Sequence, residues 1–370
     1  MLNLLEREPA YGDFYVPAFS VKIGGKDLVR DHFLTIPNVE VDLKLNTAGR
    51  FSFTVANAFD LKRREFVAEA DDRELDLLAL FKLGAKVEIR IGYGEPKKLP
   101  LLMLGLITEI GTSFAEGGVP ELKVAGSDPL YALGKSNKPR HWEDSRDSDV
   151  VADLARRQHI NSEPKRTEPQ KARIDKGQET DLVFLGKLAK RNCATFYMRG
   201  DRLQFGPRNN DLGGVIFLEW GKGLLTFTPE ANLAEQVSEV QLYGWSPEQA
   251  RPIVGRSRRG DETGRESGRR GGGDYLAEAL GAAPILYLRQ PVHSQAEADR
   301  RARALLEEKA ENFIKGSGES IGLPEILPDS NLGMGGLGRL FSRVYYVEQT
   351  THSVGANGYR TRFQVQETTL

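Results

Sequence analysis

The sequence predicts a mainly β protein in which two small β-barrels with bracing helices are separated by a small α/β module. Three observations lead to this prediction. Alternating apolar and polar residues, the pattern of half-buried strands, recur along the chain. A strand pair, a helix, a glycine-containing segment and a long final hairpin occur in the same order near both ends. Between them the pattern becomes helical, so the predicted domains are 1–130, 131–223 and 224–370.

Size and composition limit the possible classes of protein. The 370 residues suffice for two or three domains, and 39 % hydrophobic residues suffice for their cores. With 51 basic and 52 acidic residues, the net charge of −1 gives no overall attraction to nucleic acid or to an anionic membrane. The single cysteine, Cys193, allows no disulfide within the chain. We expect neither a signal peptide nor a membrane-spanning helix, because the N-terminus is soon charged and the longest apolar run is short.

The first predicted barrel follows an irregular start. Its helix is predicted over 72–83, because Leu75, Leu78 and Phe81 recur every three residues, and Gly84 ends it. The turn Asn46–Gly49 separates two of its strands. The strands are predicted at 18–23, 39–45, 51–55, 87–91, 102–114 and 121–126.

The middle module is predicted to contain two helices and a hairpin. The helix over 147–159 has Ser148 as its N-cap, and the helix over 180–191 has one apolar side. A hairpin with strands at 195–198 and 202–205 follows. Residues 161–177 are polar and interrupted by proline.

The third region returns to strands, at 237–242 and 252–256. Residues 257–274 (SRRGDETGRESGRRGGGD) predict a flexible arginine- and glycine-rich surface loop, with a basic finger that touches a partner as the alternative. A helix over 294–315 follows a capping box at Ser294. The last hairpin, 343–367, turns at Asn357-Gly358.

No residue is predicted to be catalytic, to bind a cofactor or to bind a metal. Gly333–Gly338 has the G-x-G-x-x-G spacing of a dinucleotide site, but neither the preceding strand nor the following helix is predicted, so we interpret it as a tightly packed loop. The histidines lack the spacing of metal ligands; they are His32, His141, His159, His293 and His352.

The remaining chemically notable residues predict packing. His352 is expected to be a packed or hydrogen-bonded strand residue, and Cys193 a small packed thiol. Trp142, Trp220 and Trp245 are isolated, and we interpret them as packing anchors. Paired carboxylates for glycoside cleavage are not identifiable from the sequence, although acidic residues are plentiful.

Several segments, taken in order, resemble a known family. They are FSFTVANAFD (51–60), LGAKVEIRIGYG (83–94), LMLGLITEIGTSF (102–114), LKVAGSD (122–128), QETDLVFLGKLAKRNCATFYMRGDRLQFGPR (178–208), VQLYGWSPEQARPIVGRS (240–257) and the C-terminal hairpin. Together they are similar to the phage late control D family of contractile-tail baseplate hub proteins, which is related to the N-terminal hub of VgrG in type VI secretion.

The resemblance implies a structural protein without enzymatic activity or cofactors. Its two barrels would be tail-tube-like, and three chains would form a ring of six barrels that joins a hexameric tail tube to a trimeric spike. The implied partners are two further chains of this protein, the tube protein above, a spike protein below and other baseplate proteins of the LysM or wedge type. DNA or an effector cargo would pass through the lumen, and no part of the chain would insert into a membrane.

The resemblance also implies a location and leaves alternatives open. The protein would be made in the bacterial cytoplasm and would end in a virion tail baseplate or an extracellular injection particle. Because the sequence stops at Leu370 after the second barrel, the spike is expected to be a separate polypeptide. A tail-associated peptidoglycan-degrading enzyme is the alternative function, and a nucleotide-dependent cytosolic enzyme is a weaker one.

Overall fold

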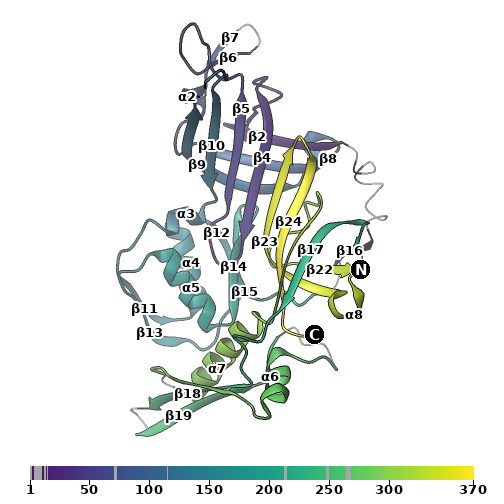
Figure 1. Ribbon diagram of the computed structural model, residues 1–370. Helices are drawn as coiled ribbons and strands as arrows, with labels where there is room; N and C mark the ends of the chain where they lie inside the picture. Colours follow the sequence, from purple (N-terminus) through teal and green to yellow (C-terminus); the bar gives the residue numbers. More distant parts are fainter. Residues whose placement is uncertain are drawn as a thin grey trace.

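The computed structural model describes residues 2–3, 11, 14, 16–70, 73–114, 116–211, 215–246, 250–263, 268–292 and 294–370. The protein is mainly β, as the sequence predicts, and its largest sheet contains 14 strands and runs through the middle of the molecule (Figure 1). This sheet consists of two units, which meet where β4 (Thr35–Lys44) pairs antiparallel with β23 (Arg343–Gly355).

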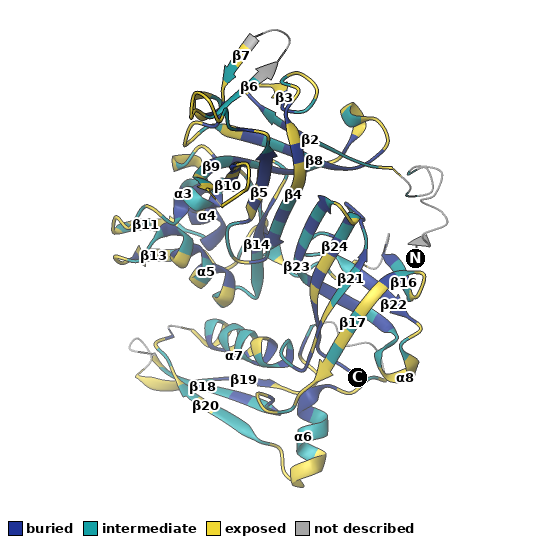
Figure 2. Ribbon diagram, turned by 45° about the horizontal axis from the view of Figure 1, so that its top comes forward, coloured by how far each residue is buried: buried dark blue, intermediate teal, exposed yellow. Residues whose placement is uncertain are grey.

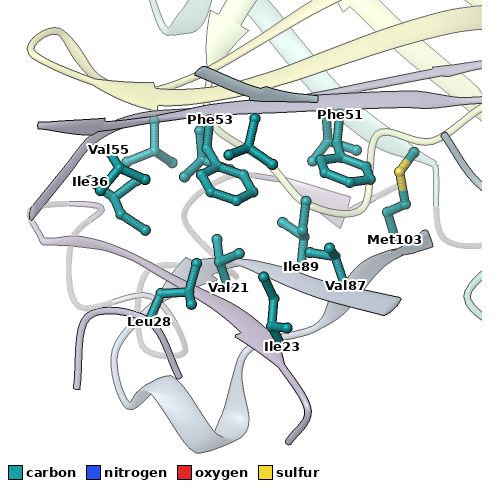
Figure 3. Close-up of a cluster of buried hydrophobic side chains, with 14 of the residues drawn as sticks. Val21, Ile23, Leu28, Ile36, Phe51, Phe53, Val55, Val87, Ile89 and Met103 are labelled. Carbon is teal, nitrogen blue, oxygen red and sulfur yellow. The ribbon is translucent and has the colours of Figure 1, made fainter. Parts of the chain in front are cut away.

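The first unit is a strongly curved antiparallel sheet with the strand order β4-β5-β10-β9-β8-β2, ending on the short β3 (Lys26–Asp27). Its two halves face each other, and Phe51 and Phe53 of one half lie opposite Val21 and Ile89 of the other (Figure 3). The strands other than β4 are β2 (Pro17–Ile23), β5 (Arg50–Ala56), β8 (Lys86–Tyr93), β9 (Leu101–Ser113) and β10 (Glu121–Ser127).

The second unit is a closed six-stranded barrel, because β22 pairs with both β16 and β23 and completes the ring β16-β17-β21-β24-β23-β22. Its core includes Leu218, Leu332, Tyr345 and Phe363. The strands other than β23 are β16 (Ile216–Trp220), β17 (Gly223–Ala231), β21 (Ile314–Ile321), β22 (Asn331–Gly335) and β24 (Gly358–Glu367). The barrel thus begins at β16, before the predicted boundary at 224, and β1 (Leu2–Asn3) pairs with β16 outside the ring.

The two units share one strand order. When the six strands of each unit are numbered along the chain, β4-β5-β10-β9-β8-β2 and β17-β21-β24-β23-β22-β16 both give 2-3-6-5-4-1. The units differ in two respects: β2 is antiparallel to β8 whereas β16 is parallel to β22, and in the described residues no pairing of β2 with β4 closes the first ring. The order is thus repeated, with one unit closed and the other open.

One predicted strand pair lies outside the barrel. The strands predicted at 237–242 and 252–256 correspond to β18 (Glu239–Ser246) and β19 (Arg251–Arg258), which form a separate sheet of order β19-β18-β20 with β20 (Ile285–Arg289). Helix α7 (Gln295–Ala310) packs on this sheet, and α6 (Gly272–Leu280) lies beside it. Alternation predicts a strand but not the sheet that it joins. In the second unit, the strand pair that corresponds to β4–β5 is therefore β17–β21 and not β18–β19.

The middle module contains the two predicted helices and the predicted hairpin. Its elements are α3 (Leu130–Leu133), β11 (Arg140–Ser145), α4 (Asp147–Arg157), β12 (Asn161–Pro164), β13 (Lys171–Lys176), α5 (Asp181–Arg191), β14 (Ala194–Arg199) and β15 (Arg202–Pro207). The polar segment 161–177 contains two short strands, β12 and β13, which belong to a three-stranded and a two-stranded sheet respectively. Ser148 is not the cap of α4; Asp149 instead accepts a hydrogen bond from the backbone N–H of Arg146, the N-cap residue.

The prediction of a helix over 72–83 is wrong for most of that range. A hairpin of β6 (Val67–Ala70) and β7 (Arg73–Asp76) precedes a four-residue helix, α2 (Leu77–Leu80). The carboxylate of Asp76 accepts hydrogen bonds from the N–H groups of Leu78 and Ala79 and so begins the helix there. Leu78 is 49 % exposed although Phe81 is buried, so the three-residue spacing did not mark one buried face.

The helix predicted at 294–315 starts as expected, with Ser294 accepting from the N–H of Glu297, but α7 ends at Ala310. Residue 314 already belongs to β21, whose pairing with β17 and β24 takes precedence over the helix. The predicted flexible loop 257–274 is wrong at both ends, because 257–258 belong to β19 and 272–274 belong to α6. Between them, the Thr263 N–H donates to Glu307 at 2.8 Å. Residues 264–267 lie outside the described part.

Candidate functional site

The surface that joins the two sheet units is a continuous polar face. Along β17, β21, β24, β23, β4, β5 and β10 every second side chain points into a core, and the residues between them point outward. Strand β17 is exposed along much of its length (Figure 2). The outward residues include Thr226, Thr228, Ser317, Glu319, Arg360, Arg362, Gln349, Thr351, Ser353, Asn38, Glu40, Asp42, Ser52 and Lys123. We call this surface the polar face.

The register of the strands places the polar and charged side chains of the polar face in rows. One row runs from Thr226 through Glu319, Arg362 and Thr351 to Asp42, with neighbours directly paired at every step from β17 to β4. Opposite charges therefore lie side by side on adjacent strands, an arrangement that stabilises cross-strand contacts. The row passes from one unit to the other without a break.

Most charges on the polar face have partners across the face. Arg362 of β24 forms an ion pair of 3.0 Å with Glu40 of β4, which bridges the seam over the intervening β23. Asp42 accepts hydrogen bonds from Gln349 at 2.9 Å and from Thr351 at 3.1 Å. Arg360 lies 4.0 Å from Glu319. Three acidic residues (Glu40, Asp42, Glu319) and three basic ones (Arg360, Arg362, Lys123) leave the face without a net charge.

The polar face is hollowed by two adjoining open depressions of about 460 and 530 Å³. Both are lined mainly by hydroxyl, amide and paired charged groups. Neither contains a nucleophile beside a base, the arrangement that acyl transfer or hydrolysis requires. The lining groups can form hydrogen bonds with water.

The structure places the predicted histidines and the cysteine in separate surroundings. His352 is fully buried on β23, where Nε2 donates to the carbonyl of Ile326 at 3.0 Å, since a carbonyl can only accept. Its Nδ1 then accepts from the Tyr359 hydroxyl at 2.8 Å, and burial lowers its pKa to about 4. Cys193 is half-buried against α7, and burial raises its pKa to about 11. His293 lies outside the described residues.

Two of the three tryptophans are not packing anchors. Trp142 stacks on Phe184 at 5.8 Å between ring centres and donates to Asp153, as predicted for an anchor. Trp220 and Trp245 are 63 % and 56 % exposed, so the prediction is wrong for both. An isolated aromatic residue on a strand gives no indication of which side of the sheet it occupies, and only the register decides that.

The glycine-rich segment 333–338 is part of the barrel wall. It contributes the end of β22 and is followed by the short helix α8 (Gly338–Phe341), so the prediction of a loop is wrong. Its glycines do allow close packing, because a Cβ at Gly335 would lie 2.5 Å from the Phe217 ring. The segment closes the ring by pairing with β16 and β23.

The described residues contain neither a metal-binding cluster nor a membrane-spanning helix. No group of three or more His, Cys, Asp or Glu side chains in the described ranges is arranged to hold a metal ion. Among the same residues, no helix has both the length and the apolar character that crossing a bilayer requires.

A family model described as the Alg8 N-terminal domain (Alg8_N) matches residues 16–356, which is most of the chain. No curated protein matches the sequence.

Solved structures of tail proteins share the fold. The 43 kDa tail protein of prophage MuSo2 from Shewanella oneidensis has a TM-score of 0.69 at 12 % identity, with 95 % of this chain and 98 % of that chain covered. A tail protein from Neisseria meningitidis MC58 has a TM-score of 0.68 at 15 % identity, with 95 % and 97 % covered. An E. coli component of the type VI secretion system has a TM-score of 0.58 at 12 % identity, with 93 % and 76 % covered. The chain thus has the fold of phage tail proteins, as the resemblance implied; the narrower likeness to late control D stays an expectation.

Proposed function

We propose that this chain, which belongs to the family of the Alg8 N-terminal domain, is a non-enzymatic baseplate hub of a contractile tail or injection particle. Three copies would form a ring that presents six similar sheet units to a hexameric tail tube and three equal surfaces to a trimeric spike. Its proposed partners are the tail tube, the spike and other baseplate proteins.

The observation that carries this proposal is the repeated strand order 2-3-6-5-4-1 within one continuous sheet. A six-fold tube and a three-fold spike cannot meet through one kind of matched surface, since closed symmetry repeats the same contact in every subunit. A chain with two similar units resolves the mismatch, because a trimer then has approximate six-fold symmetry on one side. The pairing of β4 with β23 holds the two units in a fixed relation within each chain.

The polar face supports a second part of the proposal, that it lines a central channel. Its charges are largely paired with one another, so a charged cargo would find few unpaired groups to bind. Its hydroxyl and amide groups keep the surface wetted. DNA or an effector protein could then pass along it without being held.

Light scattering and electron microscopy of the purified protein test the assembly. We expect a mass three times that of the chain and rings with six-fold features in negative stain. A protein that remains monomeric at high concentration, alone and with the tube and spike proteins, would contradict the hub.

A labelling experiment tests the orientation of the polar face separately. In a Cys193→Ser background, Ser317→Cys on the polar face is coupled to a gold label, with Lys187→Cys, exposed on α5, as the control. We expect the first label in the centre of the ring and the second on its periphery. A peripheral label at position 317 would refute the channel assignment and leave the trimer standing.

A further inference from the structure

The small sheet β19-β18-β20 has an outer face that neither the barrel strands nor the packed helix α7 uses. The inner face carries Val240, Leu242 and Ile253, which pack on Ala302 and Leu306 of α7. The outer face carries the alternate residues, and the sheet lies at the opposite end of the molecule from β6 and β7 (Figure 1). They are Glu239, Gln241, Tyr243, Trp245, Pro252, Val254, Arg256, Arg258, Ile285, Tyr287 and Arg289.

Three aromatic rings follow one another on this outer face. Tyr243 and Trp245 are two residues apart on β18, and Tyr287 of β20 lies beside Tyr243, with 6.3 Å between ring centres. Trp245 is 56 % exposed and Tyr287 is 61 % exposed. Aromatic side chains in series on a sheet form a platform on which nucleic-acid bases stack two or three at a time.

One of the three rings, that of Tyr243, is held in place by a chain of polar contacts. The Tyr243 hydroxyl donates to the Gln241 side chain at 2.9 Å, whose amide donates to Glu239 at 2.6 Å. Glu239 in turn forms an ion pair of 3.3 Å with Arg258. The tyrosine side chain is therefore restrained before any ligand arrives, which reduces the entropy cost of binding.

The charge on this face is positive. Arg256, Arg258 and Arg289 face outward and Glu239 is the acidic residue among them. Glu239 is already paired with Arg258, whereas Arg256 and Arg289 form no ion pair with any described residue. Register places Arg289 beside Tyr243 and Arg256 beside Gln241, so one guanidinium group lies on each strand that flanks β18. Cationic groups beside aromatic rings match a ligand that has both aromatic groups and negative charges.

The dimensions of the face favour a slender ligand. Strands β18 and β19 have eight residues each and β20 has five, so at about 3.3 Å per residue and about 4.8 Å between strands they cover roughly 330 Å². A stable interface between globular proteins needs about 800 Å² from each partner. An extended chain is therefore the better match. The three rings favour single-stranded nucleic acid over an acidic peptide, because an acidic peptide has no aromatic group in each repeating unit to stack on them.

We propose that the outer face of β18, β19 and β20 binds single-stranded nucleic acid, with bases stacked on Tyr243, Trp245 and Tyr287 and phosphates paired with Arg256 and Arg289. The site shares no residue with the polar face and does not depend on the hub assignment.

Fluorescence anisotropy with a labelled oligothymidylate of about 15 nucleotides, within the range of known single-strand sites, tests the proposal on the full-length protein. We expect the double variant Trp245→Ala/Tyr287→Ala to weaken binding at least tenfold, and Trp245→Phe, which keeps a ring, to bind nearly as well as wild type. Binding should quench tryptophan fluorescence in wild type and much less in Trp245→Phe.

The double variant Arg256→Gln/Arg289→Gln should lower the slope of log Kd against log salt by about 1.4, since each phosphate that is no longer neutralised accounts for about 0.7. Matched controls are Trp220→Ala and Arg339→Gln, exposed residues outside this sheet that should leave binding unchanged. Because the substituted side chains are largely at the surface, unchanged melting temperatures would verify folding.

Three outcomes would overturn the proposal. The first is no binding by the wild type at low salt. The second is equal binding by wild type and Trp245→Ala/Tyr287→Ala, which would indicate nonspecific attraction. The third is tighter binding of an oligoglutamate peptide or of duplex DNA than of the single strand, which would assign the face to another class of partner.

Discussion

Tyr197 of the middle module donates its hydroxyl hydrogen to Asp329, which precedes β22 of the barrel, at 3.0 Å. The other carboxylate oxygen of Asp329 accepts from the Tyr346 hydroxyl at 2.8 Å and from the N–H of Asn209 at 2.9 Å. The carboxylate of Asp329 therefore joins three parts of the chain. They are strand β14 of the middle module, the segment that leaves the module at Asn209, and strand β23 of the barrel wall. Burial, with the negative charge of Asp329 adding to it, raises the pKa of Tyr197 and keeps its hydroxyl protonated as a donor.

We expect Asp329→Asn to lower the free energy of unfolding by about 1–3 kcal/mol, because an amide provides one accepting oxygen where the carboxylate provides two. Asparagine is suitable since residue 329 has φ +64°, a conformation that asparagine tolerates. Urea unfolding measures the change. Asp175→Asn, an exposed carboxylate paired with Arg173, is the control and should change stability little. Equal effects of the two substitutions would show that Asp329 does not hold the junction.

Gly126→Ala should destabilise the protein by about 1–3 kcal/mol or more, because no room exists for a methyl group. A Cβ there would lie 2.0 Å from the carbonyl oxygen of Leu106 and 2.5 Å from the Phe51 ring. Gly111→Ala, on the partner strand β9 of the same hairpin, meets no atom within 4 Å and is the matched control. Thermal unfolding compares the two. If both variants melted at the wild-type temperature, the result would contradict the close packing of Gly126 against Leu106.

Glu311, which follows α7, should make the protein less stable as the pH rises. Burial raises its pKa to about 7, with the carboxylate of Glu307 adding to the shift and Arg208 opposing it. Since its folded pKa exceeds the unfolded one, its contribution is complete below about pH 4.5 and is lost as the pH rises to about 7.

We therefore expect the free energy of unfolding of Glu311→Gln, relative to that of wild type, to rise by up to roughly 3 kcal/mol between about pH 4.5 and about pH 7.5. Urea unfolding at several pH values gives this difference, and Glu308→Gln, an exposed position in the last turn of α7, is the control. A difference that stays constant across this range would exclude a raised pKa at Glu311.

His352 should act in the opposite direction. Because burial lowers its pKa to about 4, the folded protein keeps the ring neutral while the unfolded chain takes up a proton near pH 6.5. Stability from this group is present above pH 6.5 and is lost as the pH falls toward 4.

His352→Leu should be less stable than wild type at about pH 8, since the Ile326 carbonyl and the Tyr359 hydroxyl lose their partner. The deficit should shrink by up to roughly 3 kcal/mol as the pH is lowered from about 7 to about 4, because the variant lacks the titrating ring. Urea titrations at these pH values measure it, with the exposed His141→Leu as the control. A deficit that is independent of pH would show that His352 can be protonated in the folded state.

Local signals in the sequence were sufficient for most individual strands. Alternation located β4, β5, β8, β9 and β10, and the C-terminal hairpin was found from its alternating runs. Its turn differs by one residue from the predicted one: Gly355 pairs with Gly358, so Ala356 and Asn357 form the loop and Gly358, at φ +76°, takes the left-handed conformation. The polar face was not predicted, because its residues come from strands far apart in the chain.

The sequence by itself determined that this protein is built mainly of strands, that its last hairpin resembles an earlier one, and that a helical module separates them, since each depends on neighbouring residues along the chain. The tertiary structure decided which strands are neighbours, that among the described strands only the second ring closes, and that Glu40 meets Arg362 across the seam. It also decided that β18 and β19 leave the barrel and expose their aromatic residues. Pairing in a sheet depends on backbone hydrogen bonds that any residue except proline can make, so the side-chain pattern fixes a strand but not its partner.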